Sequence, residues 1–329
     1  MPYALLIGLG AGLVSAVLFA SASTGTILGL FVLFLLSPLP LAIAGLGWGW
    51  ATAAVAAGAG TALVMIAGTP RAAVFYVLAL GLPTAVLVYL TLLHRETQAA
   101  APGGQTSPGI VWYPLGRIVA AAAVWGGGLG ALALLTTARD VEALRAVLRG
   151  IFERVVVQAM PLPPVGQGGL GESEIAAVTE LIVVSFAGAV ATVWTAIALL
   201  NLWLAAIVTR KSGRLARPWQ DLSTLTLPRS LPLAFAFAIV LTFVAPAYIS
   251  LMASGFASAF LFAFMLAGLA IIHNVSRGHG LRPAILGAVY VALVLFNPLS
   301  SLVIGLVGLA EPFSPLRRRP PPSSPPTAT

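Results

Sequence analysis

Long apolar runs separated by short polar loops dominate the chain. A helix needs about 20 apolar residues to cross the hydrocarbon core of a bilayer. The pattern predicts an all-α fold, a polytopic transmembrane helical bundle of eight or nine membrane helices plus one surface amphipathic helix, in a single membrane domain over residues 1–316. The expected spans are 3–20, 26–47, 51–68, 72–93, 114–137, 174–208, 231–250, 256–272 and 283–310.

Two of these runs are interrupted by proline. Pro38 and Pro40 should kink the run over 26–47, because proline lacks the N–H that an interior helical residue donates. Asn297-Pro298 divides the last run and makes it a candidate for a re-entrant hairpin. We therefore prefer eight full crossings plus one irregular C-terminal segment.

The segment over 138–157 has a different pattern. Apolar residues such as Leu144 and Leu148 recur at helical spacing, with charged residues between them. Arg149 and Glu153 are four apart and can pair. This segment predicts an amphipathic helix that lies on the membrane surface, although docking onto another helix or covering a cavity are alternatives.

Three other polar features bound the helices. The linker over 94–112 should be disordered at its centre, and the basic, proline-rich tail over 317–329 should be disordered throughout. Ser173 is a candidate N-cap for the run over 174–208, which at about 1.5 Å per residue is too long for the bilayer and must tilt, bend or project.

Composition narrows the function classes. The chain is 59% hydrophobic and only 8% charged, whereas soluble domains carry about 25% charged residues, so a soluble enzyme is excluded. There is no cysteine, no glycine-rich phosphate loop and no recognisable Ser/His/Asp set. His273 and His279 lie near Arg277 without an acid, which favours an interfacial position over a metal site. We expect no enzymatic activity, cofactor or metal.

The net charge of +8 is interpreted as a topology signal for the lipid bilayer rather than as a nucleic-acid surface. With a re-entrant last segment, twelve basic residues lie on one side and five on the other. This places the N-terminus, the basic loops and the tail in the cytoplasm and the amphipathic segment outside. The expected topology or lipid-headgroup residues are Arg210, Lys211, Arg214, Arg217, Arg277, Arg282, Arg317, Arg318 and Arg319.

Small residues four apart form a ridge on the first predicted helix. This ridge suits internal helix packing or, alternatively, a docking face for a membrane partner subunit, and it consists of Gly8, Gly12, Ala16 and Ala20.

Glu180 lies within an apolar helix, as either a solvated interfacial carboxylate or a ligand or proton site facing a cavity. Asn201 and Trp194 on the same helix are candidate ligand contacts or interhelical hydrogen-bonding groups.

The C-terminal third resembles a bacterial family through the following residues: 268–273 (Gly-Leu-Ala-Ile-Ile-His), Arg277-Gly278, Arg282, Tyr290, Asn297-Pro298, 308–313 (Gly-Leu-Ala-Glu-Pro-Phe) and Leu316-Arg317-Arg318. With 113–117 (Tyr-Pro-Leu-Gly-Arg) and the opening helix, the chain resembles the YybS-like integral membrane proteins, a family of unknown function. That family is distantly similar to the substrate-binding S-components of energy-coupling-factor transporters. The resemblance implies that the ridge at Gly8 and Gly12 contacts a coupling subunit, although S-components have about six helices.

Two functions follow as expectations. The first is a non-enzymatic small-solute-binding or transport component of the bacterial inner membrane, working with partner subunits. The second is a structural or assembly factor of the cell envelope without a small-molecule site. A polar-lined pocket between the first six predicted helices would favour the first, and a bundle packed solid with aliphatic residues would count against it.

Overall fold

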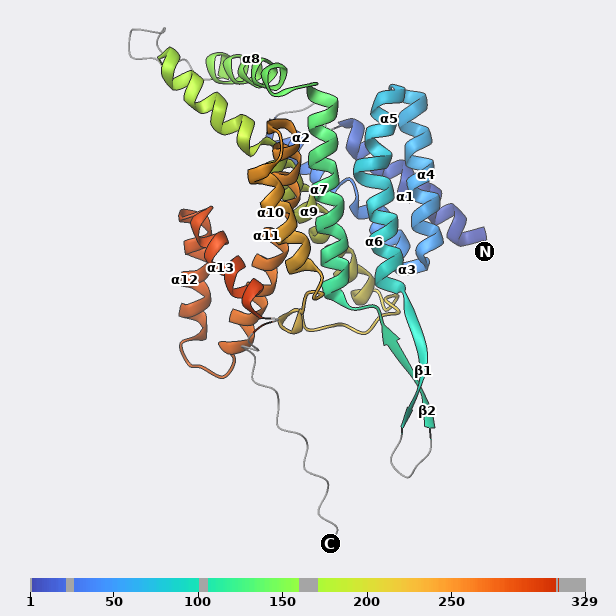
Figure 1. The fold of residues 1–329 in the computed structure, drawn as a ribbon. Coiled ribbons are helices and arrows are strands. Elements are labelled where there is room, and N and C mark those ends of the chain that lie inside the picture. The colour runs from blue at the N-terminus through green and yellow to red at the C-terminus, as the bar shows by residue number, and fades with distance from the viewer. Residues whose placement is uncertain (1, 22–26, 101–105, 160–170, 312, 314–329) are drawn as a thin grey trace.

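A computed structural model describes residues 2–21, 27–100, 106–159, 171–311 and 313 (Figure 1). These residues are mostly helical, as the expected all-α class requires. Six of their helices are long and apolar enough to cross a membrane: Tyr3–Ser21, Trp50–Ala67, Pro70–Leu92, Leu115–Thr137, Glu172–Lys211 and Ala247–Val275. The length and apolar composition of these helices indicate a membrane-embedded protein.

The N-terminal group packs through small residues. Its elements are α1 (Pro2–Ser21), α2 (Ile27–Leu36), α3 (Leu39–Trp48), α4 (Trp50–Ala67), α5 (Pro70–Tyr76), a π-helical turn (Val77–Gly81) and α6 (Leu82–Leu92). The helix axis breaks between α2 and α3 at Ser37-Pro38, where a proline kink was expected. A Cβ at Gly12 would collide with the carbonyl of Ala56 and with Ala59, so α1 approaches α4 closely because this position is glycine.

The linker over 94–112 has regular structure in its arms, where none was predicted; the disorder was expected only at its centre. Its arms form an antiparallel hairpin of β1 (His94–Ala100) and β2 (Thr106–Trp112), with His94 opposite Trp112. The centre of the linker, 101–105, lies outside the described residues. Ile110 and Val111 are strong strand formers whose effect the surrounding polar and glycine residues concealed.

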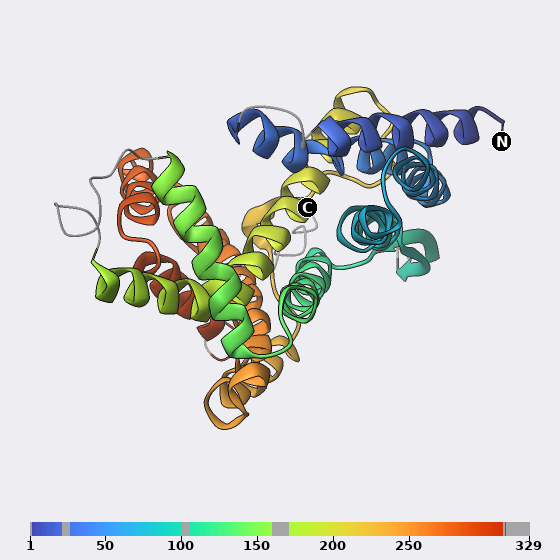
Figure 2. The same ribbon diagram turned by 90° about the horizontal axis from the view of Figure 1, so that it is seen from above.

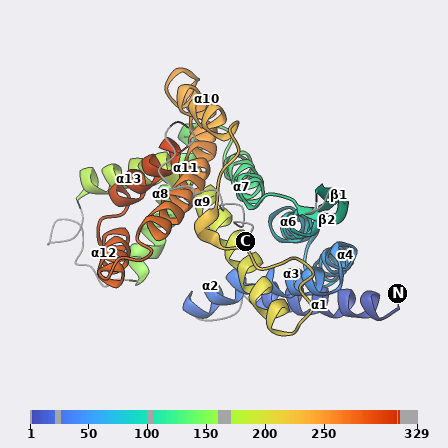
Figure 3. The same ribbon diagram turned by 90° about the horizontal axis from the view of Figure 1, so that it is seen from below.

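Two helices occupy the middle of the molecule. Figure 3 shows α7 (Leu115–Thr137) and α9 (Glu172–Lys211) between the N-terminal helices and the C-terminal ones. A Cβ at Gly126 or Gly130 would meet the backbone of α9, so these glycines set the close approach of the two helices. The 40 residues of α9 correspond to about 60 Å, and the helix runs diagonally through the molecule (Figure 1).

The start of α9 also differs from the expectation. Ser173 lies inside the helix, and Gly171 takes the N-cap position. The Glu174 carboxylate accepts a hydrogen bond from the Gly171 N–H at 2.8 Å. A side chain three residues into the helix therefore satisfies the backbone donor that precedes it.

The amphipathic segment forms α8 (Val141–Ala159), which lies across one end of the bundle and crosses α9 (Figure 2). Leu144 and Leu148 are buried in a cluster with Val183 of α9 and Leu251. Arg149 and Glu153 form the expected i,i+4 pair, with Nε and Oε1 2.7 Å apart. The apolar face of α8 is thus docked on the helices beneath it.

The C-terminal helices begin and end at other residues than the hydropathy suggested. They are α10 (Leu231–Val244), α11 (Ala247–Val275), α12 (Arg282–Leu295) and α13 (Leu299–Ala310). The expected division between 231–250 and 256–272 lies instead at Ala245-Pro246, because Pro246 cannot donate within a helix and adopts an extended conformation. Gly255 stays helical, and a Cβ at this position would make ordinary van der Waals contact with Ala187 of α9.

The last apolar run folds back on itself at Asn297-Pro298. α12 and α13 have 14 and 12 residues, about 21 and 18 Å, and each is shorter than the roughly 30 Å hydrocarbon core. α13 packs against α11 through Gly268 and Gly308, where a Cβ would meet the backbone of the other helix. Figure 1 shows that α12 and α13 return the chain to the end of the bundle from which α12 starts.

The two ends of the molecule differ in charge. The hairpin, the 212–230 loop and the α11–α12 turn share one end, and α8 and the α4–α5 turn lie at the other (Figure 1). We call the first the basic end, defined by Arg95, Arg117, Arg210, Lys211, Arg214, Arg217, Arg229, Arg277 and Arg282, against two acids in these three segments, Glu96 and Asp221. The opposite end combines Arg71, Arg139, Arg145, Arg149 and Arg154 with Asp140, Glu142, Glu153, Glu172, Glu174 and Glu180.

Candidate functional site: a cavity at the basic end

A cavity of about 370 Å³ opens at the basic end. Its walls come from the first turn of α7, the last third of α9, the end of α11 and the loop over 215–225, with Tyr290 added from α12. This volume lies near the lower limit for small-molecule sites, which are about 300–1,000 Å³. Four segments that are far apart in the sequence therefore build one concave surface.

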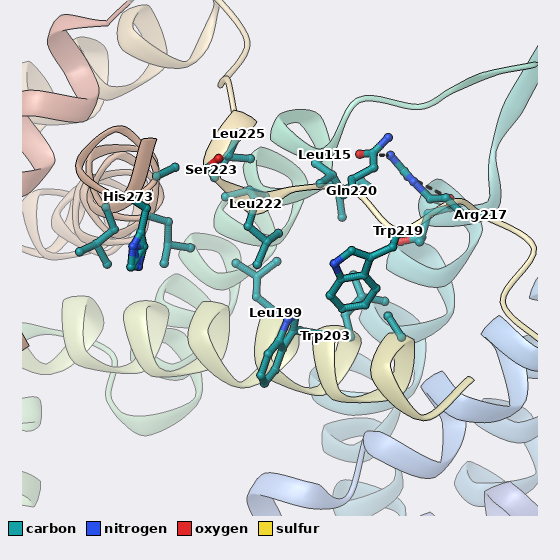
Figure 4. Close-up of a pocket in the computed structure, with 18 of the residues that line it drawn as sticks. Leu115, Leu199, Trp203, Arg217, Trp219, Gln220, Leu222, Ser223, Leu225 and His273 are labelled. Atoms are coloured by element: carbon teal, nitrogen blue, oxygen red, sulfur yellow. Dashed lines mark hydrogen bonds between the residues drawn. The ribbon is translucent and has the colours of Figure 1, made fainter. Parts of the chain in front are cut away.

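The cavity wall is predominantly apolar. Leu199 and Leu202 of α9 and Leu266 and Leu269 of α11 line it, and Trp203 and Trp219 add two indole rings. Figure 4 shows Arg217 and Gln220 at one end of the cavity and His273 at the other, with Leu199, Leu222 and the two tryptophans between them. The cavity therefore offers a long apolar surface with polar groups at its ends.

Arg217 is buried, with 4% of its surface exposed. Its Nη1 donates to the Thr91 carbonyl at 3.0 Å, and its Nη2 donates to the Tyr113 carbonyl and to Gln220 Oε1, both at 2.8 Å. Burial lowers the pKa of the guanidinium, which nevertheless stays charged. The expectation that Arg217 contacts lipid headgroups is corrected: it ties the 212–230 loop to α6 and to the start of α7.

Three polar groups of the cavity lining have a buried atom without a hydrogen-bond partner in the described part of the chain. They are Arg217 Nε, Ser223 Oγ and His273 Nδ1. His273 uses its other ring nitrogen, Nε2, which lies 3.0 Å from the Tyr290 hydroxyl. Buried polar atoms are normally paired, so these three are unsatisfied positions in the cavity wall. Each is covered by neighbouring atoms, so a bound molecule can pair with it only after the wall rearranges.

An ion pair lies beside the cavity. Arg277, after α11, donates to the carboxylate of Asp221, whose Oδ1 also accepts from the Ser223 N–H at 3.0 Å. The Arg277 guanidinium, and then the hydrogen bond from the Ser223 backbone N–H, hold the pKa of Asp221 below its ordinary value. This pair connects the loop wall to the helix that carries His273.

The other expected topology residues take different positions. The Arg210 guanidinium lies 4.7 Å from the Trp219 ring centroid, and that of Arg214 lies 4.5 Å from the Trp48 ring centroid. Lys211 is exposed, and Arg282 Nε is buried without a partner among the described residues. Arg317, Arg318 and Arg319 lie outside the described residues, as does the rest of the expected disordered tail.

The three predicted ligand contacts lie away from this cavity. Glu180 pairs with Arg145 of α8, and its side chain is 49% exposed. Asn201 is 1% exposed, and its Nδ2 donates to the Leu35 carbonyl of α2 at 2.7 Å. Trp194 packs edge-to-face with Phe34, their centroids 5.7 Å apart. Glu180 thus joins α8 to α9, and the other two hold α2 and α9 together.

The small-residue ridge of α1 is largely covered by α4 of the same chain. Gly8, Gly12 and Ala16 are buried, and a Cβ at Gly8 would touch Val55 and the Thr52 carbonyl of α4. Ala20, one helical turn further on, is exposed. Gly8 and Gly12 therefore belong to the α1–α4 interface and do not offer their own surface to a partner subunit.

Sequence reasoning named Arg217, His273 and Tyr290 in other roles and missed the remaining cavity residues. Arg217-Pro218-Trp219-Gln220 contains a guanidinium, an indole and an amide in a short loop between membrane helices, and this concentration was the available signal. Among the described residues, no group of three His, Asp or Glu side chains could hold a metal ion. Comparison with models of protein families, with curated proteins and with solved structures finds no match to this chain.

Proposed function

We propose that the protein is a non-enzymatic small-molecule-binding component of the bacterial inner membrane. The observation that carries the proposal is the cavity of about 370 Å³ at the basic end, apolar along its walls and polar at its ends. Small-molecule sites generally combine an apolar lining with a few placed polar groups. The cavity differs from the polar-lined pocket between the first six predicted helices that was expected, because its wall is mainly apolar and includes α11. It does distinguish the bundle from one packed solid with aliphatic side chains.

The resemblance to the YybS-like proteins, and through them to S-components, supports a role in solute binding or transport with partner subunits. The α1–α4 interface modifies that role, because Gly8 and Gly12 are already covered by α4. A coupling partner would meet the other face of α1, where Leu6, Leu13 and Val17 are exposed.

The proposed topology has eight crossings and a re-entrant α12–α13 hairpin. The crossings are α1, α2–α3, α4, α5–α6, α7, α9, α10 and α11. α10 has 14 residues, as α12 has, so its crossing rests on the apolar run predicted over 231–250 and not on its helical length. The basic end faces the cytoplasm in this arrangement, in keeping with the positive-inside rule, together with the N-terminus. The cavity then opens on the cytoplasmic side of the membrane, and α8 lies on the outer side.

A specific observation favours the alternative, a structural or assembly factor of the cell envelope. The β1–β2 hairpin projects from the basic end beyond the helices (Figure 1). Ile110 and Val111 are exposed on it, and a two-stranded hairpin leaves both outer edges open for pairing. Such an element suits a protein partner better than a small molecule.

Recovery of bound molecules tests the proposal. The protein is isolated in lipid nanodiscs, and molecules released on denaturation are identified by mass spectrometry. Ala206→Trp fills the cavity, and Ala54→Trp adds the same side chain to an exposed position of α4. We expect the wild type and Ala54→Trp to release a molecule that Ala206→Trp lacks. Equal release from all three, or copurified envelope proteins with no small molecule, would contradict the proposal.

A further inference from the structure

The unpaired atoms of the cavity share one chemical property. Arg217 Nε–H can only donate a hydrogen bond, and the Ser223 hydroxyl and the His273 Nδ1 position can each donate one. Leaving a buried donor unpaired is costly, so a molecule that supplies acceptor oxygens to these groups gains binding free energy. The lining therefore favours a ligand rich in oxygen acceptors.

The charge of the lining also favours a ligand that brings oxygen acceptors, and in particular an anion. Arg217 is a buried cation whose partners are neutral oxygens, two backbone carbonyls and the Gln220 amide. No aspartate or glutamate lines the cavity within the described residues, and Asp221 beside it is already paired with Arg277. A buried charge without a counter-charge attracts an anion, because the low dielectric of the interior strengthens the interaction.

The shape of the cavity indicates that the ligand also has an apolar part. Arg217 lies at one end, and Leu199, Leu222, Trp203 and Trp219 extend from there toward His273 (Figure 4). A small inorganic anion would leave this apolar wall empty. The volume of about 370 Å³ is small, which favours one hydrocarbon chain over two.

We propose that the cavity binds a single-chain anionic amphiphile, with its phosphate or carboxylate group at Arg217 and its chain along the leucine and tryptophan wall. This inference rests on the proposed function and names the ligand class of the same site. Both acidic headgroups present the same chemistry, oxygen acceptors with negative charge.

Four probes test the ligand class in nanodiscs of zwitterionic lipid. They are dodecyl phosphate, dodecanoate, dodecyltrimethylammonium and inorganic phosphate, and the chain-bearing probes carry bromine so that bound chains quench Trp203 and Trp219. We expect both anionic amphiphiles to bind at least about tenfold more tightly than the cation, the discrimination that one charge-assisted hydrogen bond supplies. Inorganic phosphate alone should bind far more weakly than dodecyl phosphate.

Variants link the preference to the named atoms. Ser223→Ala removes an unpaired hydroxyl and should weaken dodecyl phosphate binding while leaving the stability of the empty protein unchanged. Arg217→Gln should abolish the anion preference, and Arg214→Gln, a cation of the same loop that packs on Trp48, should keep it. If Arg217→Gln does not fold, Ser223→Ala and the probe series still decide.

The outcomes distinguish a failure of the proposed ligand class from a failure of the cavity as a binding site. Equal or tighter binding of the cationic amphiphile would overturn the anionic class and leave a small-molecule site standing. Quenching that Ala206→Trp does not reduce, or no saturable quenching by any amphiphile, would overturn the cavity as a binding site altogether. Binding of inorganic phosphate as tight as that of dodecyl phosphate would overturn the role assigned to the chain.

Discussion

The indole N–H of Trp125 in α7 donates a hydrogen bond to the Leu78 carbonyl at 3.0 Å. Leu78 lies in the π-helical turn Val77–Gly81, where the Leu82 N–H bonds to the Val77 carbonyl one residue further back than in an α-helix. The next position, Pro83, has no N–H to offer to Leu78. Trp125 therefore supplies from a neighbouring helix the donor that the proline removes.

This relationship predicts a conditional loss of stability. Trp125→Phe should lower the free energy of unfolding by about 1–3 kcal/mol, because it leaves the Leu78 carbonyl unpaired in the bundle. In a Pro83→Ala background the restored N–H can pair that carbonyl, so the same substitution should cost less. Unfolding in mixed detergent measures all four proteins of this double-mutant cycle. Equal costs in the two backgrounds would contradict the interpretation.

A second prediction concerns the α1–α4 contact. Gly12→Ala should destabilise the protein by about 1–3 kcal/mol, because the added methyl group collides with the Ala56 carbonyl and the backbone of α4 cannot yield easily. Gly10→Ala is the matched control, since a Cβ there meets nothing within 4 Å. Thermal unfolding in nanodiscs should place Gly10→Ala at or above the wild type. A destabilised Gly10→Ala with an unchanged Gly12→Ala would reverse the assignment of the packed face.

The hydropathy pattern was sufficient for the helical class, because apolar runs of span length leave the backbone few alternatives in lipid. It could not locate the break at Pro246, since Ser254-Gly255 is an equally plausible loop signal in the sequence. In the structure α11 runs unbroken through Ser254-Gly255 and packs there near Ala187 of α9, and such tertiary packing is not visible in a single sequence.

The cavity could be predicted even less. Arg217 looked like the other cations of its loop, and its burial depends on carbonyls more than a hundred residues away, at Thr91 and Tyr113. Glu180 stood out because it was an acid in an apolar run, but its partner Arg145 belongs to a helix that folds back over α9. Sequence patterns identified unusual residues but not their partners.

A third prediction separates the two roles considered for Glu180. Glu180→Gln should leave amphiphile binding unchanged, because its half-exposed carboxylate pairs with Arg145 away from the cavity. Leu144→Ala, which truncates a fully buried side chain under α8, should destabilise the docking of α8 by about 2–5 kcal/mol. Hydrogen exchange of the α8 amides measures the docking, and quenching measures the binding. Loss of binding in Glu180→Gln would restore its ligand role.

A fourth prediction treats Asp221–Arg277 as a latch beside the cavity. Asp221→Asn should speed the dissociation of the bound amphiphile a few-fold, because the loop that carries Ser223 loses its tie to the end of α11. Asp221→Glu is the control that keeps the charge.

The latch also has an expected pH profile. Because Arg277 lowers the pKa of Asp221, the carboxylate stays ionised well into acid. The contribution of the pair is present above the ordinary pKa of the group and is lost as the pH falls through its lowered value. For a ligand whose own charge does not change in this interval, stopped-flow dissociation rates should therefore be flat between about pH 8 and pH 5. A rate that rises in this interval would show that another group controls release.

The last prediction concerns the sidedness of the basic end, and the absence of native cysteine makes it direct. Single cysteines at Glu96 and His279 lie on exposed positions of the hairpin and the α11–α12 turn, and those at Arg71 and Arg139 lie on exposed positions of the opposite end. An impermeant maleimide added to intact cells should label Arg71→Cys and Arg139→Cys but neither of the others, because the basic end faces the cytoplasm. Labelling of Glu96→Cys and His279→Cys alone would show that the protein has the opposite orientation. Labelling of one residue from each end would contradict the proposed number of crossings.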